Sequence, residues 1–269
     1  MTLSIAVCIK QGPDPEHFSK ISLDQVTKTI SREGIPAVTN PWDKNALEEG
    51  LRIRERFSGK VFVLTMGPPQ AERALEEALA MGADEAFLLC DRAFAAADTL
   101  ATAYTLACGI RKIGYFDLIL CGNETIDSGT GQVGPQIAHF LDIPCITSVK
   151  EIAFDGERTL MVKQALEGGY MKVKINLPAL LAVNREINKA RLPTAFGILE
   201  ASEKEIKSWG REDIGAALDS IGIMGSPTKV IESFEHRPNR KMEIMTGSPE
   251  EMVRKAIQKV KELGVELSS

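Results

Sequence analysis

The chain has 269 residues, of which 44% are hydrophobic, so it can bury a core without disulfide bridges or structural metals. Its formal net charge is −5 with both signs interspersed, which argues against the broad basic face of a nucleic-acid-binding protein. It contains no apolar run of 18 residues, and its N-terminus begins a strand at once, so we expect neither a membrane span nor a signal peptide.

Short apolar strands alternate with helical patterns over the first 150 residues, which predicts βαβ units and a mainly parallel sheet in an α/β fold. The expected strands are 3–9, 61–66, 86–90, 118–121 and 145–149. The expected helices run from an N-cap at Asp43 to about Phe57, from Pro69 to Gly82, from a cap at Asp98 or Thr99, and over 132–141.

The rhythm changes after Val149, where three strand-like runs follow with short breaks at 160–165, 170–175 and 179–183. Glu167-Gly-Gly169 supplies the turn of a hairpin. A capping box at Ser248 begins a final helix whose apolar residues form one stripe. Residues beyond 204 have little core of their own. We therefore expect an α/β domain over 1–204 and a C-terminal arm over 205–269, which packs on its own domain or on a partner.

The loop that follows the expected strand 118–121 is the most informative stretch. Gly122, Gly129 and Gly131 allow backbone amides to approach a ligand, and a helix start follows, where unpaired N–H groups favour a phosphate. Asp127, Ser128 and Thr130 add carboxylate and hydroxyl groups. The pattern is neither a Walker loop nor GxGxxG, so a nucleotide loop and a plain glycine-rich turn both remain open.

Other segments with polar groups end strands at the same expected edge of the sheet. They are the tip of the first strand with Cys8 and Lys10, and the stretches 40–43, 65–69 and 91–99. Each has a structural alternative, because Cys8 can be a core residue, Trp42 a buried aromatic and Arg92 a surface residue. Ligands of open α/β sheets bind at this edge, so we expect one binding site there.

Neither catalytic residues nor a metal site is predicted. His17, His139 and His236 are too scattered for a triad or a metal cluster. The cysteines show neither CxxC spacing nor clustering with histidine, which argues against disulfides and zinc and fits a reducing cytoplasm. The five are Cys8, Cys90, Cys108, Cys121 and Cys145.

Taken in order, the motifs resemble the small (beta) subunit of electron transfer flavoproteins, nearly end to end. The similar segments are Val7-Cys-Ile-Lys-Gln-Gly-Pro-Asp14, Asn40-Pro-Trp-Asp-Lys-Asn-Ala-Leu-Glu-Glu49, Ala78-Leu-Ala-Met-Gly-Ala-Asp84, the loop 122–132, and 167–169 followed by 177–182. The resemblance implies a Rossmann-like doubly wound sheet and a heterodimer with a large (alpha) subunit that holds an FAD. The small subunit then carries a second nucleotide, FAD or AMP.

Stretches 91–99 and 65–70 resemble the flavin-bearing, bifurcating members, in which the flavin takes a hydride from NADH. FAD is therefore preferred here, and AMP in a plain electron relay is the alternative. The residues expected around the nucleotide are Cys8, Lys10, Asn40, Pro41, Trp42, Asp43, Met66, Asp98, Thr99, Gly122, Asn123, Glu124, Thr125, Ile126, Asp127, Ser128, Gly129, Thr130, Gly131, Gln132 and Val133.

The sequence departs from the family pattern at informative places. Asn123 and Glu124 stand where a basic residue and a glutamine are usual, which disfavours an anionic flavin nearby. The stretch 191–201, with Arg191, resembles the loop by which the family docks acyl-CoA dehydrogenases. Ala195 replaces the usual leucine anchor there, so either the partner is a related flavoenzyme instead of an acyl-CoA dehydrogenase, or Phe196 takes the anchor role.

Two further classes share parts of the pattern. A nucleotide-binding regulator of the stress-protein type has the same sheet and loop but moves no electrons, and the hairpin and arm disfavour it. An adenylating hydrolase or ligase needs a pyrophosphate loop after the first strand, and Gln11-Gly-Pro-Asp14 is a poor one.

Overall fold

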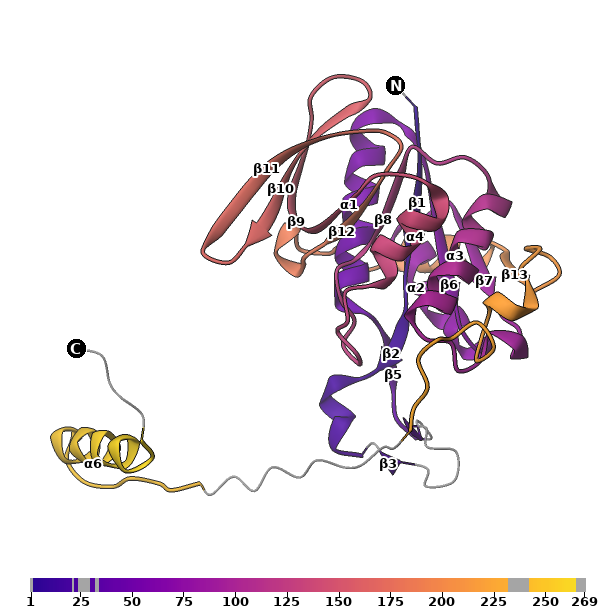
Figure 1. The fold of residues 1–269 in the computed structure, drawn as a ribbon. Coiled ribbons are helices and arrows are strands. Elements are labelled where there is room, and N and C mark those ends of the chain that lie inside the picture. The colour runs from indigo at the N-terminus through magenta and orange to yellow at the C-terminus, as the bar shows by residue number, and fades with distance from the viewer. Residues whose placement is uncertain (1, 21, 24–29, 32–33, 232–241, 265–269) are drawn as a thin grey trace. The chain divides into compact units, whose positions relative to one another are not determined.

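A computed structural model describes residues 2–20, 22–23, 30–31, 34–231 and 242–264. The chain divides into two compact units, Met1–Ile231 and Glu232–Ser269, and the first contains the large sheet (Figure 1). None of the helices within the described ranges has the length and apolar character that crossing a membrane requires.

The described part of the first unit is built on a sheet of nine strands in the order β11-β10-β9-β12-β8-β1-β6-β7-β13. Every neighbouring pair is parallel except the two pairs that β10 makes. The strands are β1 (Leu3–Cys8), β6 (Gly59–Met66), β7 (Glu85–Leu89), β8 (Leu118–Gly122), β9 (Cys145–Phe154), β10 (Thr159–Leu166), β11 (Gly169–Asn176), β12 (Ala179–Val183) and β13 (Ile206–Trp209).

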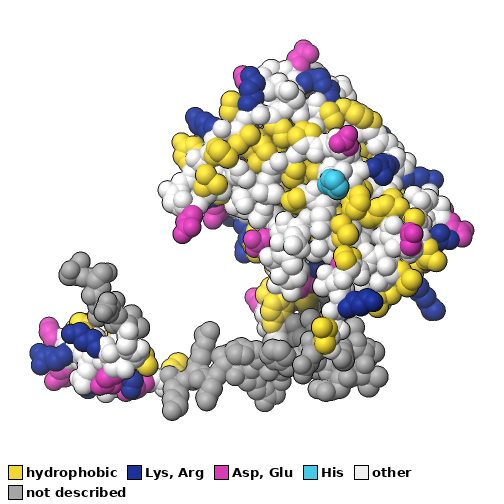
Figure 2. Space-filling model, in the orientation of Figure 1, with side chains coloured by type: hydrophobic (Ala, Val, Ile, Leu, Met, Phe, Trp, Pro, Cys, Tyr) yellow, Lys and Arg dark blue, Asp and Glu magenta, His cyan; other side chains and the backbone are white. Residues whose placement is uncertain are grey.

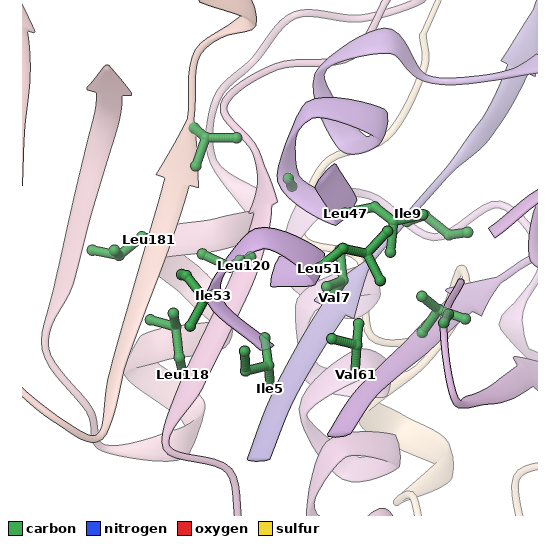
Figure 3. Packing of buried hydrophobic residues seen from close by; sticks show 14 of the residues in the cluster. Ile5, Val7, Ile9, Leu47, Leu51, Ile53, Val61, Leu118, Leu120 and Leu181 are labelled. Atoms are coloured by element: carbon green, nitrogen blue, oxygen red, sulfur yellow. The ribbon is translucent and has the colours of Figure 1, made fainter. Parts of the chain in front are cut away.

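Helices cover both faces of this sheet, because its central strands are apolar on both sides. Ile5 and Val7 of β1 pack into a cluster with α1 (Pro41–Phe57) and α2 (Glu72–Met81), where Leu47 and Leu51 lie against them (Figure 3). Ala6 and Cys8 of β1 point the other way, toward α3 (Thr99–Ile113) and α4 (Val133–Leu141). The predicted doubly wound α/β class is confirmed.

The predicted start of the first helix was wrong. α1 begins at Pro41 and Asn40 occupies its N-cap position, whereas Asp43 lies inside the first turn. Proline suits the first helical position, since its missing N–H has no partner there in any case. At the next helix, Pro69 opens only a short 3₁₀ turn, η2 (Pro69–Ala71), before α2 begins at Glu72.

The predicted hairpin is confirmed, and it lies at the opposite end of the sheet from β13 (Figure 1). β10 and β11 join through Glu167 and Gly168, and the positive φ of Gly168 suits the tight turn. The strand expected over 145–149 was predicted too short, since β9 continues to Phe154 and pairs with β10 there. Two shorter pairs add β2 (Gln11–Pro13) to β5 (Ala37–Thr39) and β3 (Ser22–Leu23) to β4 (Ile30–Ser31).

The segment that follows residue 204 contributes to the large sheet before it leaves the first unit, because β13 pairs with β7. Further short helices of this unit are η1 (Pro15–Lys20), η3 (Arg92–Phe94), η4 (Arg185–Ile187), α5 (Ala195–Ser202) and η5 (Leu218–Ser220). In the second unit, α6 (Pro249–Glu262) begins at the predicted capping box, where Ser248 and Glu251 bond each other's backbone N–H. Its apolar residues Val253 and Ile257 are exposed.

Candidate functional site

The direction of the chain's progress through the sheet reverses beside β1. From β1 the chain proceeds to β6 and β7 on one side, and it then returns to β8 on the other side. Such a switch point leaves a crevice at the carboxyl ends of the strands. A cavity of about 910 Å³ lies there, lined by residues from the ends of β1, β6, β7 and β8. We call it the carboxyl-edge cavity.

Asp43 holds the two strands that flank the switch point. One carboxylate oxygen accepts the N–H of Lys10 at 2.8 Å, just after β1, and the other accepts the N–H of Gly122 at 2.8 Å, at the end of β8. Its side chain is buried, and burial raises the pKa of Asp43 to about 7 although these hydrogen bonds act to lower it. Gly122 allows this close approach, since a Cβ there would lie 2.5 Å from an Asp43 oxygen.

The predicted nucleotide loop is held from three sides. Asn40 donates to the carbonyl of Glu124 at 2.8 Å, and the Nζ of Lys10 lies 2.6 Å from the carboxylate of Asp127. The side-chain oxygen of Asn123 accepts the N–H of Ser148 from β9 at 2.8 Å. Gly129 and Gly131 lie in the same loop and adopt positive φ. The loop is therefore a built structure whose glycines serve its backbone path.

Two helix starts border the carboxyl-edge cavity. Asp98 caps α3 by accepting the N–H groups of Leu100 and Ala101, and Thr99 donates to the Gln132 side chain at 3.2 Å, just before α4. Thr99 and Gln132 both line the cavity. The start of α4 has no side-chain cap, so its first N–H groups and its positive dipole end suit an anion such as a phosphate, whereas at α3 Asp98 already takes two N–H groups.

The thiols at the carboxyl-edge cavity are not reactive nucleophiles. Burial raises the pKa of Cys8 to about 12 and holds the pKa of Cys121 well above its usual value, so both thiols stay neutral. All five cysteines are free, and no three His, Cys, Asp or Glu side chains of the described residues are arranged to hold a metal. Of the three histidines considered in the sequence analysis, His236 lies outside the described residues. On the face shown in Figure 2, charged side chains of both signs are interspersed.

Most of the residues expected around a nucleotide line the carboxyl-edge cavity. They are Cys8, Lys10, Asp43, Met66, Asp98, Thr99, Gly122, Asn123, Glu124, Thr125, Ser128, Thr130, Gly131, Gln132 and Val133. Six others lie outside its lining, namely Asn40, Pro41, Trp42, Ile126, Asp127 and Gly129. Of these, Asn40 and Asp127 hold the loop through the contacts above, and Trp42 lies under the Arg185 guanidinium at 5.3 Å.

The sequence analysis missed part of the wall. Ile9, Cys90, Thr102 and Gly134 also line the cavity, and each directly follows a strand end or lies in the first turn of a helix. Extending each predicted segment at the carboxyl ends of the strands by one residue would have found Ile9, Cys90 and Gly134, and extending it through the first helical turn would have found Thr102. Thr228 lines the cavity too, from a segment without regular structure, and no local signal marks it.

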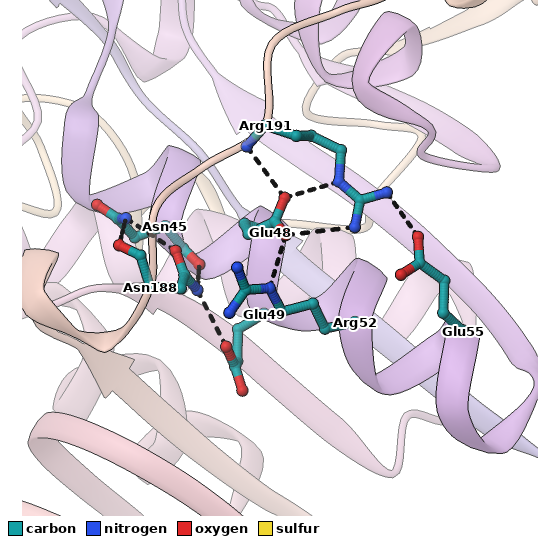
Figure 4. Close-up of polar contacts among 7 residues, drawn as sticks. All are labelled: Asn45, Glu48, Glu49, Arg52, Glu55, Asn188 and Arg191. Atoms are coloured by element: carbon teal, nitrogen blue, oxygen red, sulfur yellow. Dashed lines mark hydrogen bonds and ion pairs between the residues drawn. The ribbon is translucent and has the colours of Figure 1, made fainter.

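The predicted docking segment is fixed to α1 by a buried carboxylate (Figure 4). Glu48 accepts the backbone N–H of Arg191 at 3.1 Å and its Nε at 2.7 Å, while Glu55 accepts the other end of the guanidinium. Burial acts to raise the pKa of Glu48, but bonds from Arg191 and Arg52 outweigh it and hold the pKa below its usual value. Arg191 thus holds the start of the segment in place.

Beyond this fixed point the segment exposes apolar side chains. Leu192 is 85% exposed and Phe196, in the first turn of α5, is 69% exposed. Ile198 and Leu199 are exposed as well, whereas Ala195 adds little apolar surface. Large exposed apolar side chains gathered in one segment are typical of a surface that binds another protein.

The fold and site define a doubly wound α/β protein with a ligand-sized cavity at its switch point. The Electron transfer flavoprotein domain matches residues 27–214. The chain is 48% identical to the electron transfer flavoprotein subunit beta of Thermoanaerobacterium thermosaccharolyticum, over 96% of this chain and 98% of that protein. It is 43% identical to the caffeyl-CoA reductase-Etf complex subunit CarD of Acetobacterium woodii, over 97% and 98%.

A further relative is Protein FixA of Azotobacter vinelandii, 41% identical over 94% of this chain and 93% of that protein. The chain belongs to the electron transfer flavoprotein family and is similar to its beta subunits throughout its length. Membership among the beta subunits implies that the chain has an alpha subunit as its partner.

Proposed function

We propose that this chain binds an adenine nucleotide, preferably FAD, in the carboxyl-edge cavity, and that it passes electrons as part of a heterodimer with a large subunit that carries a second FAD. The single observation that carries the proposal is the position of the cavity in a member of this family. It lies at the switch point, where two helix starts and a glycine-containing loop converge.

The extent of the cavity favours FAD over AMP. Its lining runs from Cys8 and Gly122 at the switch point, past Met66 at the end of β6, to the stretch 91–99 after β7. A volume of about 910 Å³ is near the upper end of the range of roughly 300–1,000 Å³ for small-molecule sites. A mononucleotide at the switch point leaves the β6 and β7 side open, whereas a dinucleotide fills both.

The residues present fit such a group. The uncapped helix start at Val133 suits a phosphate, and Met66, Pro68 and Phe94 give the β6 and β7 side an apolar wall for a ring system. The bound flavin would supply the redox chemistry, while the chain positions it and shields it. Electron bifurcation with NADH as donor is part of the proposal, and the similarity to the subunit of a caffeyl-CoA reductase-Etf complex supports it.

AMP in a plain electron relay is the second candidate, because acidic side chains outnumber basic ones in the cavity lining. Asp43, Asp91, Asp98 and Glu124 face it together with only Lys10 and Arg92. Such a lining would disfavour a flavin ring that gains negative charge on reduction, whereas AMP has no redox-active ring, so this charge balance counts against FAD alone.

The test is to co-purify the chain with its large subunit and to count the released FAD and AMP per heterodimer. Two FAD without AMP supports the proposal, and one FAD with one AMP replaces it by the relay. A well-folded heterodimer without nucleotide in the small subunit contradicts both.

The five free thiols fit the reducing cytoplasm, which we propose as the location of this chain.

We further propose that an acyl-CoA dehydrogenase or a related flavoenzyme docks on the segment from Leu192 to α5. Arg191 fixes the start of the segment, and Phe196 is the expected anchor in place of the small Ala195. Phe196→Ala should weaken electron transfer between the heterodimer and the dehydrogenase about tenfold or more, because an aromatic anchor buried in the interface is worth about 2 kcal/mol. The measurement is the rate of electron transfer at increasing dehydrogenase concentration.

Leu218→Ala is the matched control, since Leu218 is 58% exposed and belongs to η5. Its rate should equal that of the unchanged protein. An unchanged rate in Phe196→Ala excludes Phe196 as the anchor, and Leu192→Ala then tests its more exposed neighbour.

A further inference from the structure

Two aspartates at the carboxyl edge hold segments that come from much later in the chain. Asp91, after β7, accepts the N–H of Ala93 at 2.9 Å with one oxygen and the N–H of Arg211 at 2.9 Å with the other. Asp98 repeats this arrangement. One of its oxygens caps α3, and the other accepts the backbone N–H of Thr228 at 3.0 Å.

We call residues 221–228 the strap. Ser226 is buried, accepts the backbone N–H of Asp98 at 2.8 Å, and donates its own hydroxyl to the carbonyl of Gly222 at 2.7 Å. Gly222 has a φ of +51°, and a Cβ there would lie 2.0 Å from the carbonyl oxygen of Ala93. The strap therefore has a defined path against the stretch 91–98, and its last residue, Thr228, lines the cavity.

The bonding of Asp98 leaves it little capacity to bind a ligand directly. A carboxylate has about four acceptor positions. The N–H groups of Leu100, Ala101 and Thr228 take three, and a side-chain hydrogen bond from Thr228 takes another. Asp98 lines the cavity, yet its oxygens are directed to the helix start and to the strap.

We infer that Asp98 is a positioning residue: it fixes the strap as a wall of the carboxyl-edge cavity, and the strap so held retains the bound nucleotide. The inference rests on the proposed function, because it takes the occupant of the cavity to be that nucleotide. It revises the expected role of Asp98 from a direct contact to the nucleotide into an indirect one through Thr228.

Asp98→Asn separates the two tasks of this side chain. Asparagine caps helices about as well as aspartate, so its oxygen preserves the start of α3. Its NH₂ group cannot accept the N–H of Thr228, so the bond to the strap is lost. Ser226→Ala removes the second attachment of the strap, which is the bond to the backbone N–H of Asp98, and leaves the Asp98 carboxylate unchanged. Asp117→Asn is the matched control, because Asp117 bridges strands at the opposite edge of the sheet.

The experiment uses the heterodimer of the full chain with its large subunit. FAD and AMP that remain bound are measured at timed intervals after gel filtration, and amide hydrogen exchange is followed in the strap and in α3. Asp98→Asn should speed nucleotide loss about tenfold and Ser226→Ala about threefold, because a hydrogen bond to a carboxylate is stronger than one between a hydroxyl and a backbone N–H. Exchange should rise in the strap and stay unchanged in α3. Asp117→Asn should leave both readouts at the unchanged protein's values.

Faster loss without faster exchange in the strap overturns the inference, because Asp98 then acts on the nucleotide directly. Faster exchange with unchanged loss overturns it as well, because the strap then retains nothing. The unchanged heterodimer reports separately on the proposed function. If its small subunit holds no nucleotide, that function fails and the inference fails with it, whereas normal loading with equal loss rates in all variants overturns the inference alone.

Discussion

Aspartates hold chain segments together at both ends of the strands of the large sheet, but the groups that they bind differ between the two ends. We call these ends the amino edge and the carboxyl edge. At the amino edge, Asp117 accepts the N–H of Ser4 in β1, and Asp84 accepts the N–H of Val61 in β6. Each of these carboxylates also pairs with an arginine, Arg158 and Arg54 respectively. At the carboxyl edge, Asp43, Asp91 and Asp98 join strands and loops through backbone N–H groups.

This difference helps to explain why the sheet has a cavity at its carboxyl edge. At the amino edge each aspartate uses its remaining capacity on an arginine side chain, so it holds no further backbone segment of the described chain. A carboxylate that gathers backbone N–H groups instead draws loops toward itself, and the loops leave a cavity between them. Three substitutions test whether the carboxyl edge is specialised for binding while the amino edge serves stability.

Gly122→Ala should have the largest effect. The new Cβ would lie 2.5 Å from both the Asp43 carboxylate and the Cβ of Trp42, so the clamp between β1 and β8 must open. Overpacking together with a buried carboxylate that loses a partner should cost about 4 kcal/mol in the free energy of unfolding, and nucleotide should be lost. Urea unfolding and nucleotide content measure the two effects.

Gly169→Ala is the control for this change, because its Cβ meets nothing within 4 Å. It should leave both quantities as they are. A Gly122→Ala protein that keeps its nucleotide contradicts the role given to the clamp.

Asp43→Asn should change how stability depends on pH. Burial raises the pKa of Asp43 to about 7 in the folded state from an ordinary value of 3.8, so the folded state binds the proton more tightly than the unfolded state. The contribution of Asp43 is therefore fully present below about pH 4 and is lost as the pH rises through 7. Between pH 5 and pH 7 the loss should be about 2 kcal/mol.

Asparagine does not titrate, so the difference in free energy of unfolding between the unchanged protein and Asp43→Asn isolates this slope. Unfolding by urea at pH 5, 6, 7 and 8 measures it. Parallel curves for the two proteins would show that Asp43 keeps an ordinary pKa in the folded chain.

Asp117→Asn should have the smallest effect of the three. It weakens the contacts to Ser4 and Arg158 at the amino edge and should cost about 1–2 kcal/mol in stability. Nucleotide content should stay at its full value, because the carboxyl-edge cavity is not touched. Loss of nucleotide in this variant at a temperature where the chain remains folded would contradict the division of tasks between the edges.

Sequence patterns predicted the sheet well because burial on both faces demands continuous apolar strands, as in Leu118–Gly122 and Ala179–Val183. They also placed much of the cavity lining, since strand ends of a parallel sheet meet at one edge. The part of the lining that no local pattern could have supplied depends on distant contacts. Thr228 reaches the cavity through Asp98, 130 residues earlier in the chain, and nothing in its local sequence marks that.

Of two further misses, one had a local signal and the other had none. A proline at the first helical position could have placed the start of α1 at Pro41 and so freed Asp43 for its contacts with two strand ends. The sequence around Arg191 is typical of an exposed connection, and only the fold brings Arg191 to the buried Glu48. A side chain that binds across the fold cannot be separated by local pattern from one that points to solvent.

The cavity wall includes Cys8 from the first strand and Thr228 from the strap, so its two sides are synthesised far apart in time. A chain that emerges from the ribosome from its N-terminus has the sheet-forming strands β1 to β12 available well before the strap. A nucleotide that needs the finished wall cannot guide that early folding. If the nucleotide that we propose needs the strap, it would stabilise the chain only after the strap has been synthesised, and its loading would follow the folding of the earlier strands.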